Sequence, residues 1–566
     1  MTIELSNLTF TDEDDVVPAS GEDEILNTGI ANTLAGNDKI TGTKDIISTT
    51  SPAYSIFNSG TLNTADGDDI ITGTISGSER TPYSTSSIEN SGTLNTGDGN
   101  DILTGIGGRA SIANSGTLNT GNGSDIITGI RHQNEASDFL SFGVSSSGGI
   151  IDTGDGNDII IGIGSIGVNI NTASINTGDG NDAITGTGLI NSGIDVNYQG
   201  ILDTGNGSDT ITGTGSYGIS NFFIFNTGDG NDTITGNGTL LGGYGIVNSG
   251  TMDTGAGNDE ITGTHANGWG IYNYSDSTID TGDGNDTITG NGTLLGDYGI
   301  SNKGTIDTGA GNDEITGTNA NGWGIYNYSD STIDTGDGND TITSFGNIGI
   351  YNLGLYNNSI INTGNGTDSI ITQGKFFNTG NVFLEEGNDL IVADAGFPNR
   401  ALENLGFIGT GDGNDTITST GVIYNEGIIE TGNGDDSIIV DGGADDLTGI
   451  RYGIYNSGGA INTGDGNDSI IANEGFQSGP NSGGAWFLGE GDDYIKGYGS
   501  GEFSGGNGND TLELTPGTYT VKRWYTAVTF TKGSTVMITS EFEKLIAGST
   551  TYDFTNLTKG QTITVA

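Results

Sequence analysis

The amino-acid sequence predicts an all-β protein, a parallel β-helix or β-solenoid made of stacked coils. Three observations predict it. An acidic nine-residue phrase occurs nineteen times between Asp38 and Asp510, in eighteen steps of 17 to 33 residues that average 26. Isoleucine and other large aliphatic residues recur in register with the phrase. Repeats of about 20–50 residues indicate a solenoid, because a single coil cannot bury its apolar side chains without its neighbours.

The phrase is clearest at Thr281–Thr289, which reads TGDGNDTIT. Its two glycines allow left-handed turns that other residues resist, and Thr-Ile-Thr favours a strand in which Ile288 is the only large apolar side chain. Two carboxylates and several turn carbonyls converge there as hard oxygen ligands, which suit Ca²⁺ better than softer metals. Each copy therefore predicts a turn, a short strand and a calcium site.

The closing Asp of each copy is the predicted metal ligand. A single acidic glycine turn is usually just a solvated turn, so the interpretation depends on the repetition. The acid at position three is a weaker candidate, because it is Asp or Glu in only 11 of the 19 copies. The predicted ligands are Asp38, Asp69, Asp101, Asp125, Asp158, Asp182, Asp209, Asp232, Asp259, Asp286, Asp313, Asp340, Asp368, Asp389, Asp415, Asp436, Asp468, Asp493 and Asp510.

The phrase resembles the nonapeptide GGxGxDxUx of hemolysin-type, or repeats-in-toxin (RTX), calcium-binding proteins, in which U is a large aliphatic residue. Gly505–Glu513 fits it at every fixed position. The resemblance implies that turn carbonyls and the Asp carboxylate bind Ca²⁺ between coils, with Asp286 as a ligand and Ile288 in the core. The chain departs from the RTX pattern in two ways. Most copies begin with Thr instead of Gly, and the motif recurs about every 26 residues instead of every nine. This variant implies one row of ions, roughly one per coil interface.

The composition of the chain indicates that folding depends on metal binding. Asp and Glu number 72 against 15 Lys and Arg, and the net charge of −57 disfavours a compact state. Low hydrophobicity with high net charge is also the signature of disorder, so we expect disorder in the metal-free chain. About 18 divalent ions between 19 motifs would supply roughly +36 and cancel well over half of the charge. Folding and calcium binding are then one process.

Within a repeat, Ile271, Ile279 and Ile288 predict three short strands per coil, each giving one core residue. A recurrent Asn, as in Asn273 and Asn327, fits a ligand, but stacked Asn side chains that bond from coil to coil explain it better. Thr-rich strands resemble the flat Thr arrays of ice-binding solenoids, although ordinary outward-facing strand residues explain them more simply.

Three regions are expected along the chain. Residues 1–30 form an N-terminal cap, residues 31–513 form the calcium-binding solenoid of about 19 coils, and residues 514–566 form a C-terminal β cap. The last region holds strand-like runs with hairpins around Lys532-Gly533. Its phrase Phe542–Leu545 and the run Thr562–Val565 resemble the C-terminal regions of proteins exported by type I secretion.

Export without an N-terminal signal peptide is the expected route. Met1–Gly21 is acidic and lacks a basic start and an apolar core, and cysteine is absent. No apolar run approaches about 18 residues, so no membrane-spanning helix is predicted. The acidic charge argues against nucleic acid as a partner, because phosphate would be repelled. The expected location is extracellular or on the cell surface.

Three function classes fit such a chain. The first is a non-enzymatic structural protein of a surface layer, sheath, fibril or adhesin, whose partners are Ca²⁺ and either further copies of itself or cell-surface polysaccharide. The alternative is a β-helix lyase, hydrolase or epimerase acting on polysaccharide, for which the basic residues are too scattered. A toxin would need a further region. Residues 227–280 and 281–334 differ at five positions, and the Asn319 counterpart of His265 argues against a catalytic His265.

Overall fold

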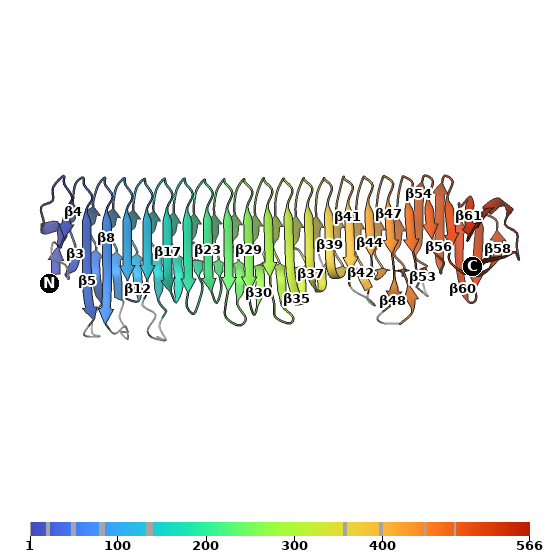
Figure 1. The fold of residues 1–566 in the computed structure, drawn as a ribbon, viewed down its shortest axis with the longest axis horizontal. Coiled ribbons are helices and arrows are strands. Elements are labelled where there is room, and N and C mark those ends of the chain that lie inside the picture. Colours follow the sequence, from blue (N-terminus) through green and yellow to red (C-terminus); the bar gives the residue numbers. More distant parts are fainter. Residues whose placement is uncertain are drawn as a thin grey trace. The chain divides into compact units, whose positions relative to one another are not determined.

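The computed structural model describes residues 2–18, 23–46, 52–77, 85–131, 140–354, 359–395, 400–445, 449–479 and 483–566. These residues fall into two compact units, Met1–Leu294 and Leu295–Ala566. Each unit is a parallel β-helix in which corresponding strands of successive coils pair side by side (Figure 1). The predicted boundaries at 30/31 and 513/514 stay predictions.

One coil of the first unit shows how the sequence makes the fold. Its three strands are β30 (Trp269–Asn273), β31 (Thr278–Asp280) and β32 (Thr287–Asn291). Side chains of a strand point alternately to its two faces, so one residue in each strand enters the interior. Ile271, Ile279 and Ile288 are completely buried. The prediction of three strands and three core residues per coil is confirmed.

Strands that follow the acidic turn form the first column. It comprises, in the first unit, β2 (Val16–Val17), β5 (Lys39–Ile46), β8 (Ile70–Gly77), β11 (Ile102–Ile106), β14 (Ile126–Ile130), β17 (Ile159–Gly164), β20 (Ala183–Gly188), β23 (Thr210–Gly215), β26 (Thr233–Gly238), β29 (Glu260–His265) and β32. Ile211 lies opposite Ile234 and Ile234 opposite Ile261, so like residues stack on like.

The next strand of each coil belongs to the second column. In the first unit it comprises β1 (Thr2–Glu4), β3 (Glu24–Asn27), β6 (Ala53–Asn58), β9 (Thr85–Asn90), β12 (Ala110–Asn114), β15 (Phe142–Ser147), β18 (Ile166–Asn171), β21 (Ile194–Asn197), β24 (Ile219–Asn221), β27 (Tyr244–Asn248) and β30. A 3₁₀ turn, η1 (Leu5–Asn7), follows β1.

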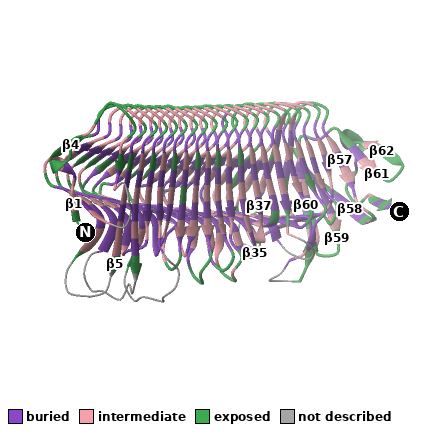
Figure 2. Cartoon of the chain, turned by 60° about the vertical axis from the view of Figure 1, so that its left-hand side comes forward, coloured by how far each residue is buried: buried purple, intermediate pink, exposed green. Residues whose placement is uncertain are grey.

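The third column leads back to the acidic turn. In the first unit it comprises β4 (Ile30–Asn32), β7 (Thr61–Asn63), β10 (Thr93–Asn95), β13 (Thr117–Asn119), β16 (Ile150–Asp152), β19 (Ser174–Asn176), β22 (Ile201–Asp203), β25 (Ile224–Asn226), β28 (Thr251–Asp253) and β31. Burial follows the alternation along the strands, whereas the turns carry exposed residues (Figure 2).

The second unit repeats these columns with fewer breaks. Its first column is β35 (Glu314–Asn327), β37 (Thr341–Asn352), β39 (Ser369–Asn378), β41 (Leu390–Asp394), β44 (Thr416–Ser419), β47 (Ser437–Val440), β52 (Ser469–Ala472), β55 (Tyr494–Lys496), β57 (Thr511–Leu514) and β61 (Lys544–Ala547). In β35, β37 and β39 one continuous strand spans what are two strands elsewhere, so the expected three-strand coil is reduced to two there.

The remaining columns of the second unit are shorter. The second column adds β33 (Tyr298–Asn302), β42 (Arg400–Asn404), β45 (Val422–Asn425), β50 (Ile454–Asn456) and β53 (Phe476–Ser478). The third is β34 (Thr305–Asp307), β36 (Thr332–Asp334), β38 (Ile360–Asn362), β40 (Asn381–Phe383), β43 (Phe407–Gly409), β46 (Ile428–Glu430), β51 (Ala460–Asn462), β54 (Ala485–Glu490), β56 (Gly501–Asn507) and β60 (Thr535–Ser540). A small antiparallel pair, β48 (Gly443–Ala444) and β49 (Arg451–Tyr452), lies beside them.

The predicted Asn ladder is confirmed. At the end of the second column, Asn58 donates from Nδ2 to Oδ1 of Asn90 at 2.8 Å, and Asn221 donates in the same way to Asn248. In the second unit Asn378 donates to Asn404 at 2.8 Å. These amides are buried, so each bond satisfies groups that would otherwise be unpaired.

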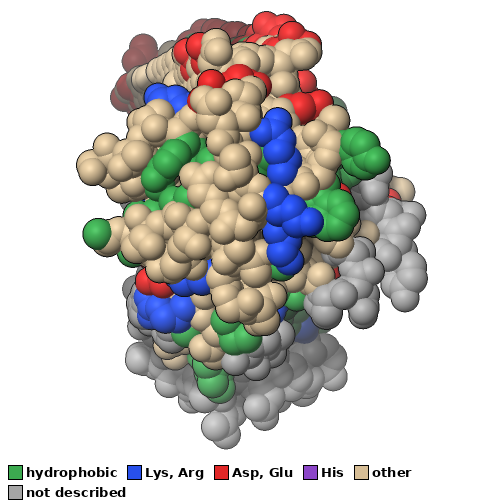
Figure 3. All heavy atoms as spheres, turned by 90° about the vertical axis from the view of Figure 1, so that its right-hand side faces the viewer, with side chains coloured by type: hydrophobic (Ala, Val, Ile, Leu, Met, Phe, Trp, Pro, Cys, Tyr) green, Lys and Arg blue, Asp and Glu red, His purple; other side chains and the backbone are tan. Residues whose placement is uncertain are grey.

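Antiparallel strands close the C-terminal end of the second unit. β58 (Gly517–Trp524) pairs with β59 (Ala527–Lys532), and β59 pairs with β60 through the predicted hairpin at Lys532-Gly533. β62 (Thr550–Asp553), η2 (Phe554–Asn556) and β63 (Thr562–Val565) complete the region. Figure 3 looks onto this end, where Lys and Arg side chains run down the surface below a group of Asp and Glu. No helix among the described residues is long and apolar enough to cross a membrane.

Candidate metal centre

Each unit contains one column of buried carboxylates. All nineteen predicted ligands are at most 2% exposed, and each lies directly before a strand of the first column. Within each unit the acidic turns form a row of arches, which lie along the upper edge of Figure 1. By contrast, position-three acids such as Asp229 and Asp283 are exposed. The distinction between the closing Asp and the position-three acid therefore corresponds to a difference in burial.

Within each unit, one oxygen of the carboxylate is used to join neighbouring coils. In the first unit the backbone N–H of Asp209 donates to Oδ1 of Asp232 at 2.8 Å, and that of Asp232 donates to Oδ1 of Asp259 at 2.7 Å. The second unit repeats this bond, for example from Asp368 N–H to Asp389 Oδ1 at 2.8 Å. A carboxylate that accepts a backbone N–H also lowers its own pKa, so the bond favours the charged form.

The second oxygen has no such partner. In seventeen members of the column, all but Asp286 and Asp313, Oδ2 is buried and accepts no hydrogen bond from a described residue. A buried polar atom without a partner costs about 1–3 kcal/mol, and more when it is charged. The same oxygen lacks a partner at the same place in seventeen coils, and a bound cation would satisfy it.

The electrostatics of the column support the same conclusion. Burial raises the pKa of Asp69 to about 6, that of Asp101 to about 7 and that of Asp389 to about 8. The nearby Thr hydroxyl, at Asp69 and Asp101, and the N–H from the preceding coil, at all three, lower these pKa values in part. The charges of neighbouring carboxylates raise these pKa values further. A bound cation would reverse both effects, because it stabilises the deprotonated form.

The turn around each Asp supplies further oxygens. Gly228 has a φ of 75°, and a Cβ added there would lie 1.9 Å from the carbonyl oxygen of Gly205. At Gly230 a Cβ would lie 1.5 Å from the carbonyl oxygen of Gly207. The glycines thus allow turn carbonyls of neighbouring coils to pack closely beside the carboxylate. No three acidic, His or Cys side chains cluster among the described residues, so a metal shell here must combine the Asp with backbone oxygens, the hard donor set that Ca²⁺ accepts.

The Thr that replaces the first Gly of the RTX phrase has a structural role. Its side chain is buried and its hydroxyl donates along the stack, from Thr431 Oγ1 to the carbonyl of Thr463 at 3.0 Å and from Thr463 Oγ1 to the carbonyl of Leu488 at 2.9 Å. A glycine could not make this bond. The departure from the RTX pattern therefore adds a contact between coils.

Two carboxylates that the sequence analysis missed extend the columns. Asp15 N–H donates to Asp38 Oδ1 at 2.7 Å, and Asp510 N–H donates to Glu543 Oε2 at 2.8 Å. Neither has the glycines of the phrase, which is why the motif did not identify them. The usable signal is an acid two residues before a buried aliphatic residue, as in Asp15-Val16-Val17 and Glu543-Lys544-Leu545.

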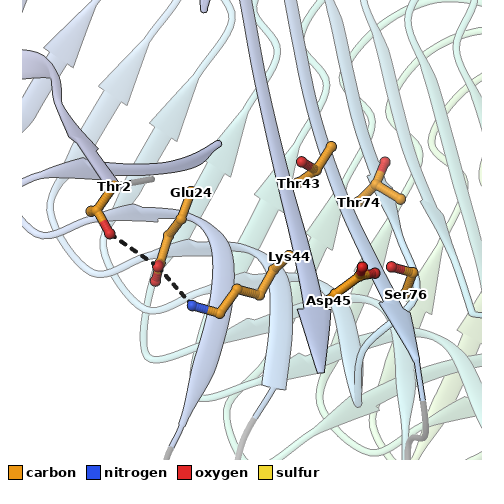
Figure 4. A pocket seen from close by; sticks show the side chains of 7 residues that line it. All are labelled: Thr2, Glu24, Thr43, Lys44, Asp45, Thr74 and Ser76. Atoms are coloured by element: carbon orange, nitrogen blue, oxygen red, sulfur yellow. Dashed lines mark hydrogen bonds and ion pairs between the residues drawn. The ribbon is translucent and has the colours of Figure 1, made fainter. Parts of the chain in front are cut away.

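A hollow of about 500 Å³ lies near the N-terminus of the first unit (Figure 4). Its Glu24 carboxylate pairs with Lys44 Nζ at 2.7 Å and accepts a hydrogen bond from Thr2 Oγ1 at 3.3 Å. Lys44 thus neutralises Glu24, while Asp45 is a second carboxylate among the residues that line the hollow.

Comparisons with known proteins leave the family open. No family model matches the chain, and no curated protein matches it. One solved structure is described as a hyperactive, Ca²⁺-dependent, β-helical antifreeze protein from an Antarctic bacterium; it is 20% identical, with a TM-score of 0.32, over 61% of this chain and 84% of that chain. A likeness at this level carries no argument, so the fold rests on the chain's own strand pairing: this protein is a parallel β-helix with one acidic turn per coil.

Proposed function

We propose that this protein is a calcium-binding structural protein of the cell surface or extracellular matrix, an RTX-like β-helix that folds when Ca²⁺ binds. The observation that supports it best is the column of buried Asp Oδ2 atoms that lack a partner. The closing Asp residues and the turn carbonyls beside them would hold the ions. Bound Ca²⁺ would supply positive charge where burial and carboxylate repulsion otherwise oppose folding.

The surface location is part of the same proposal. Extracellular calcium modules commonly bind at about 10⁻⁴ to 10⁻³ M, so a chain of this kind stays unfolded where calcium is scarce and folds where it is abundant. The charge of −57 and the absence of cysteine fit this route. We propose that the chain is exported by type I secretion, with its C-terminal region as the signal. Its partners at the surface would be further copies of itself or cell-surface polysaccharide.

We propose no catalytic activity. A groove with unrepeated polar residues lies over β21, β24 and β27, and Asp195 is the one carboxylate among its lining residues. Glycoside hydrolysis ordinarily uses two carboxylates, and lyase chemistry on a polyanion needs basic groups. The groove therefore fits the binding of a ligand better than its turnover.

Calcium titration of the chelator-treated full chain tests the proposal. We expect circular dichroism to show a gain of β structure on adding Ca²⁺, with Mg²⁺ much less effective because it demands a stricter octahedral shell. Elemental analysis of the dialysed protein should find roughly one calcium per coil interface. A spectrum that excess chelator leaves unchanged, together with a bound calcium content near zero, would remove the proposal.

A further inference from the structure

A pocket on the outer face of the second column lies outside the metal centre. It has a volume of about 320 Å³, within the about 300–1,000 Å³ of small-ligand sites. Its floor comes from β21, β24 and β27, and its sides come from the turns at either end of these strands. Unlike the acidic turns, this surface does not repeat: Asp195 lies in register with Asn169 on one side and Ser220 on the other.

An aromatic stack ends at this pocket. Trp269 stacks on Tyr244 with ring centroids 4.7 Å apart, and Tyr244 stacks on Tyr217 at 5.7 Å, both with ring planes within 19°. No described aromatic ring stacks on the other side of Tyr217. In the coil before it, Asn191 and Ser192 line the pocket instead. One face of the Tyr217 ring is therefore left for a ligand.

Polar side chains surround that aromatic face. Asp195 is only 8% exposed, yet it lines the pocket together with Asn191 and Asn197. No Lys, Arg or His is among the lining residues. Burial raises the pKa of Asp195 to about 6. The side chain of Asn197 donates a hydrogen bond to this carboxylate. Because no cation lies beside it, hydroxyl donors of a ligand would stabilise the buried charge further.

We propose that this pocket binds an uncharged pyranose ring, with the C–H face of the sugar on Tyr217 and its hydroxyl groups on Asp195, Asn191 and Asn197. A pyranose combines an apolar face with an edge of hydroxyl donors and acceptors, which matches one aromatic face bordered by a carboxylate and amides. An acidic sugar is disfavoured, because its carboxylate would meet Asp195. The inference deepens the proposed surface role by giving the polysaccharide a site.

The pocket is separate from the calcium column. Asp195 belongs to the second column, whereas Asp182 and Asp209, the closing Asp residues on either side of it in the sequence, precede strands of the first column. The sugar is held by side chains of the coil and not through an ion. Calcium is needed only to the extent that it folds the coils.

The calcium-loaded full chain would be tested on an array of immobilised neutral, uronate-containing and amino-sugar oligosaccharides. We expect binding to neutral pyranosides and none to uronates. Calorimetry with the best soluble neutral oligosaccharide should then give affinities about tenfold or more lower for Tyr217→Ala and for Asp195→Asn, because a stacking face and charge-assisted hydrogen bonds are lost.

Tyr455→Ala is the matched control, because Tyr455 is also an outward ring stacked on a neighbour, Tyr424, with centroids 5.0 Å apart. It should bind the sugar as the unaltered chain does. Circular dichroism and calcium content, measured on the same samples, separate this inference from the proposed function. A chain that is folded without calcium and binds sugar would overturn the proposed function and leave this inference standing. The inference is overturned if no saccharide binds, if both pocket variants bind normally, or if tetramethylammonium binds there and neutral sugars do not.

Discussion

A buried carboxylate with one bonded and one orphaned oxygen defines the acidic turn at the scale of the residue. Asp232 accepts the Asp209 N–H on Oδ1, while its Oδ2 has no partner among the described residues. Asp229, in the same turn, is exposed and accepts only a long hydrogen bond of 3.3 Å from Ala256 N–H. The two acids therefore differ in environment although the sequence places them three residues apart.

Asp232→Ala should disturb the coils on either side of it. The variant loses a buried hydrogen bond, which costs about 1–3 kcal/mol, and in addition the proposed ion contacts. Because each coil is supported mainly by its neighbours, hydrogen exchange should accelerate around residues 209–259 while distant coils stay protected. Asp229→Ala is the control and should change protection little. Equal loss in both variants would contradict the assignment of the ligand.

Asn248→Ala should destabilise the coil without affecting calcium. The buried Asn248 side chain donates to Asn273 Oδ1 at 2.9 Å and to the Thr278 carbonyl at 2.8 Å. Its removal leaves buried groups unpaired at a cost of about 1–3 kcal/mol. Chemical denaturation in calcium should show this loss with an unchanged calcium content, and Asn267→Ala, at an exposed turn, should stay within about 0.5 kcal/mol. A fall in bound calcium would link the ladder to the metal.

Much of the site could be predicted at this scale, because the phrase marks the closing Asp by two glycines and a following aliphatic residue. Asp15 and Glu543 could not be found in the same way, since their turns lack those glycines. The pocket at Asp195 was also missed. Two strands separate Tyr217 from Asp195 in the sequence, and nothing in the local sequence shows that one face of the Tyr217 ring lies at the same pocket.

Close approach of backbones controls the acidic turn at the scale of the element. Gly230 faces the Gly207 carbonyl oxygen so closely that a Cβ has no room, whereas a Cβ at Gly242 would meet nothing within 4 Å. Gly242 has a φ of 79°, which disfavours other residues by only about 1–2 kcal/mol. Gly230 also has a positive φ, 157°, so both glycines carry a conformational preference and only Gly230 is crowded as well.

Gly230→Ala should destabilise the protein more than Gly242→Ala. The added methyl group must push two coils apart at the turn, and overpacking commonly costs about 1–3 kcal/mol or more. Urea denaturation in saturating calcium would compare the variants, and a calcium titration should show weaker binding for Gly230→Ala alone. Similar stabilities for the two variants would mean that the turn has more room than the structure gives it.

Strand lengths could be predicted only in part. The segment from Glu260 to Asn273 forms two strands, but its near copy, Glu314 to Asn327, forms the single strand β35. The local sequences differ only at His265/Asn319, and both side chains accept a hydrogen bond from the N–H two residues later. The difference lies in the strand that pairs with β35. This strand, β37, is itself continuous and pairs with β35 on both sides of an irregularity between Asn319 and Trp323.

Net charge dominates at the scale of the whole molecule. The exposed position-three acids add to the buried column, and 15 basic residues cannot balance 72 acidic ones. The division into two units at Leu294/Leu295 falls inside the near-identical repeats of residues 281–334. Because the sequences on both sides are so similar, no composition shift marks this boundary and the sequence could not predict it.

Acid should partly replace calcium. Burial raises the folded-state pKa of Asp101, Asp158 and Asp232 to about 7, so the folded chain binds more protons than the unfolded chain. The metal-free fold is therefore most stable below the ordinary Asp pKa and loses that stability as pH rises through about 6–7. In chelator, circular dichroism should show more β structure at pH 5 than at pH 8. Progressive loss of β structure on acidification over that range would contradict this sign.

Within each unit, the hydrogen bond from a closing Asp N–H to the next carboxylate makes the joints between coils alike. Removing residues 210–232 would place Asp209 directly before Thr233, the residue that lies in register with Thr210, and Asp209 would then meet the Oδ1 atom that Asp232 now uses on Asp259. Recombination between repeats can thus shorten or lengthen a gene of this kind by whole coils without creating a new joint. Chain length becomes a trait that varies among descendants while both ends of the molecule stay the same.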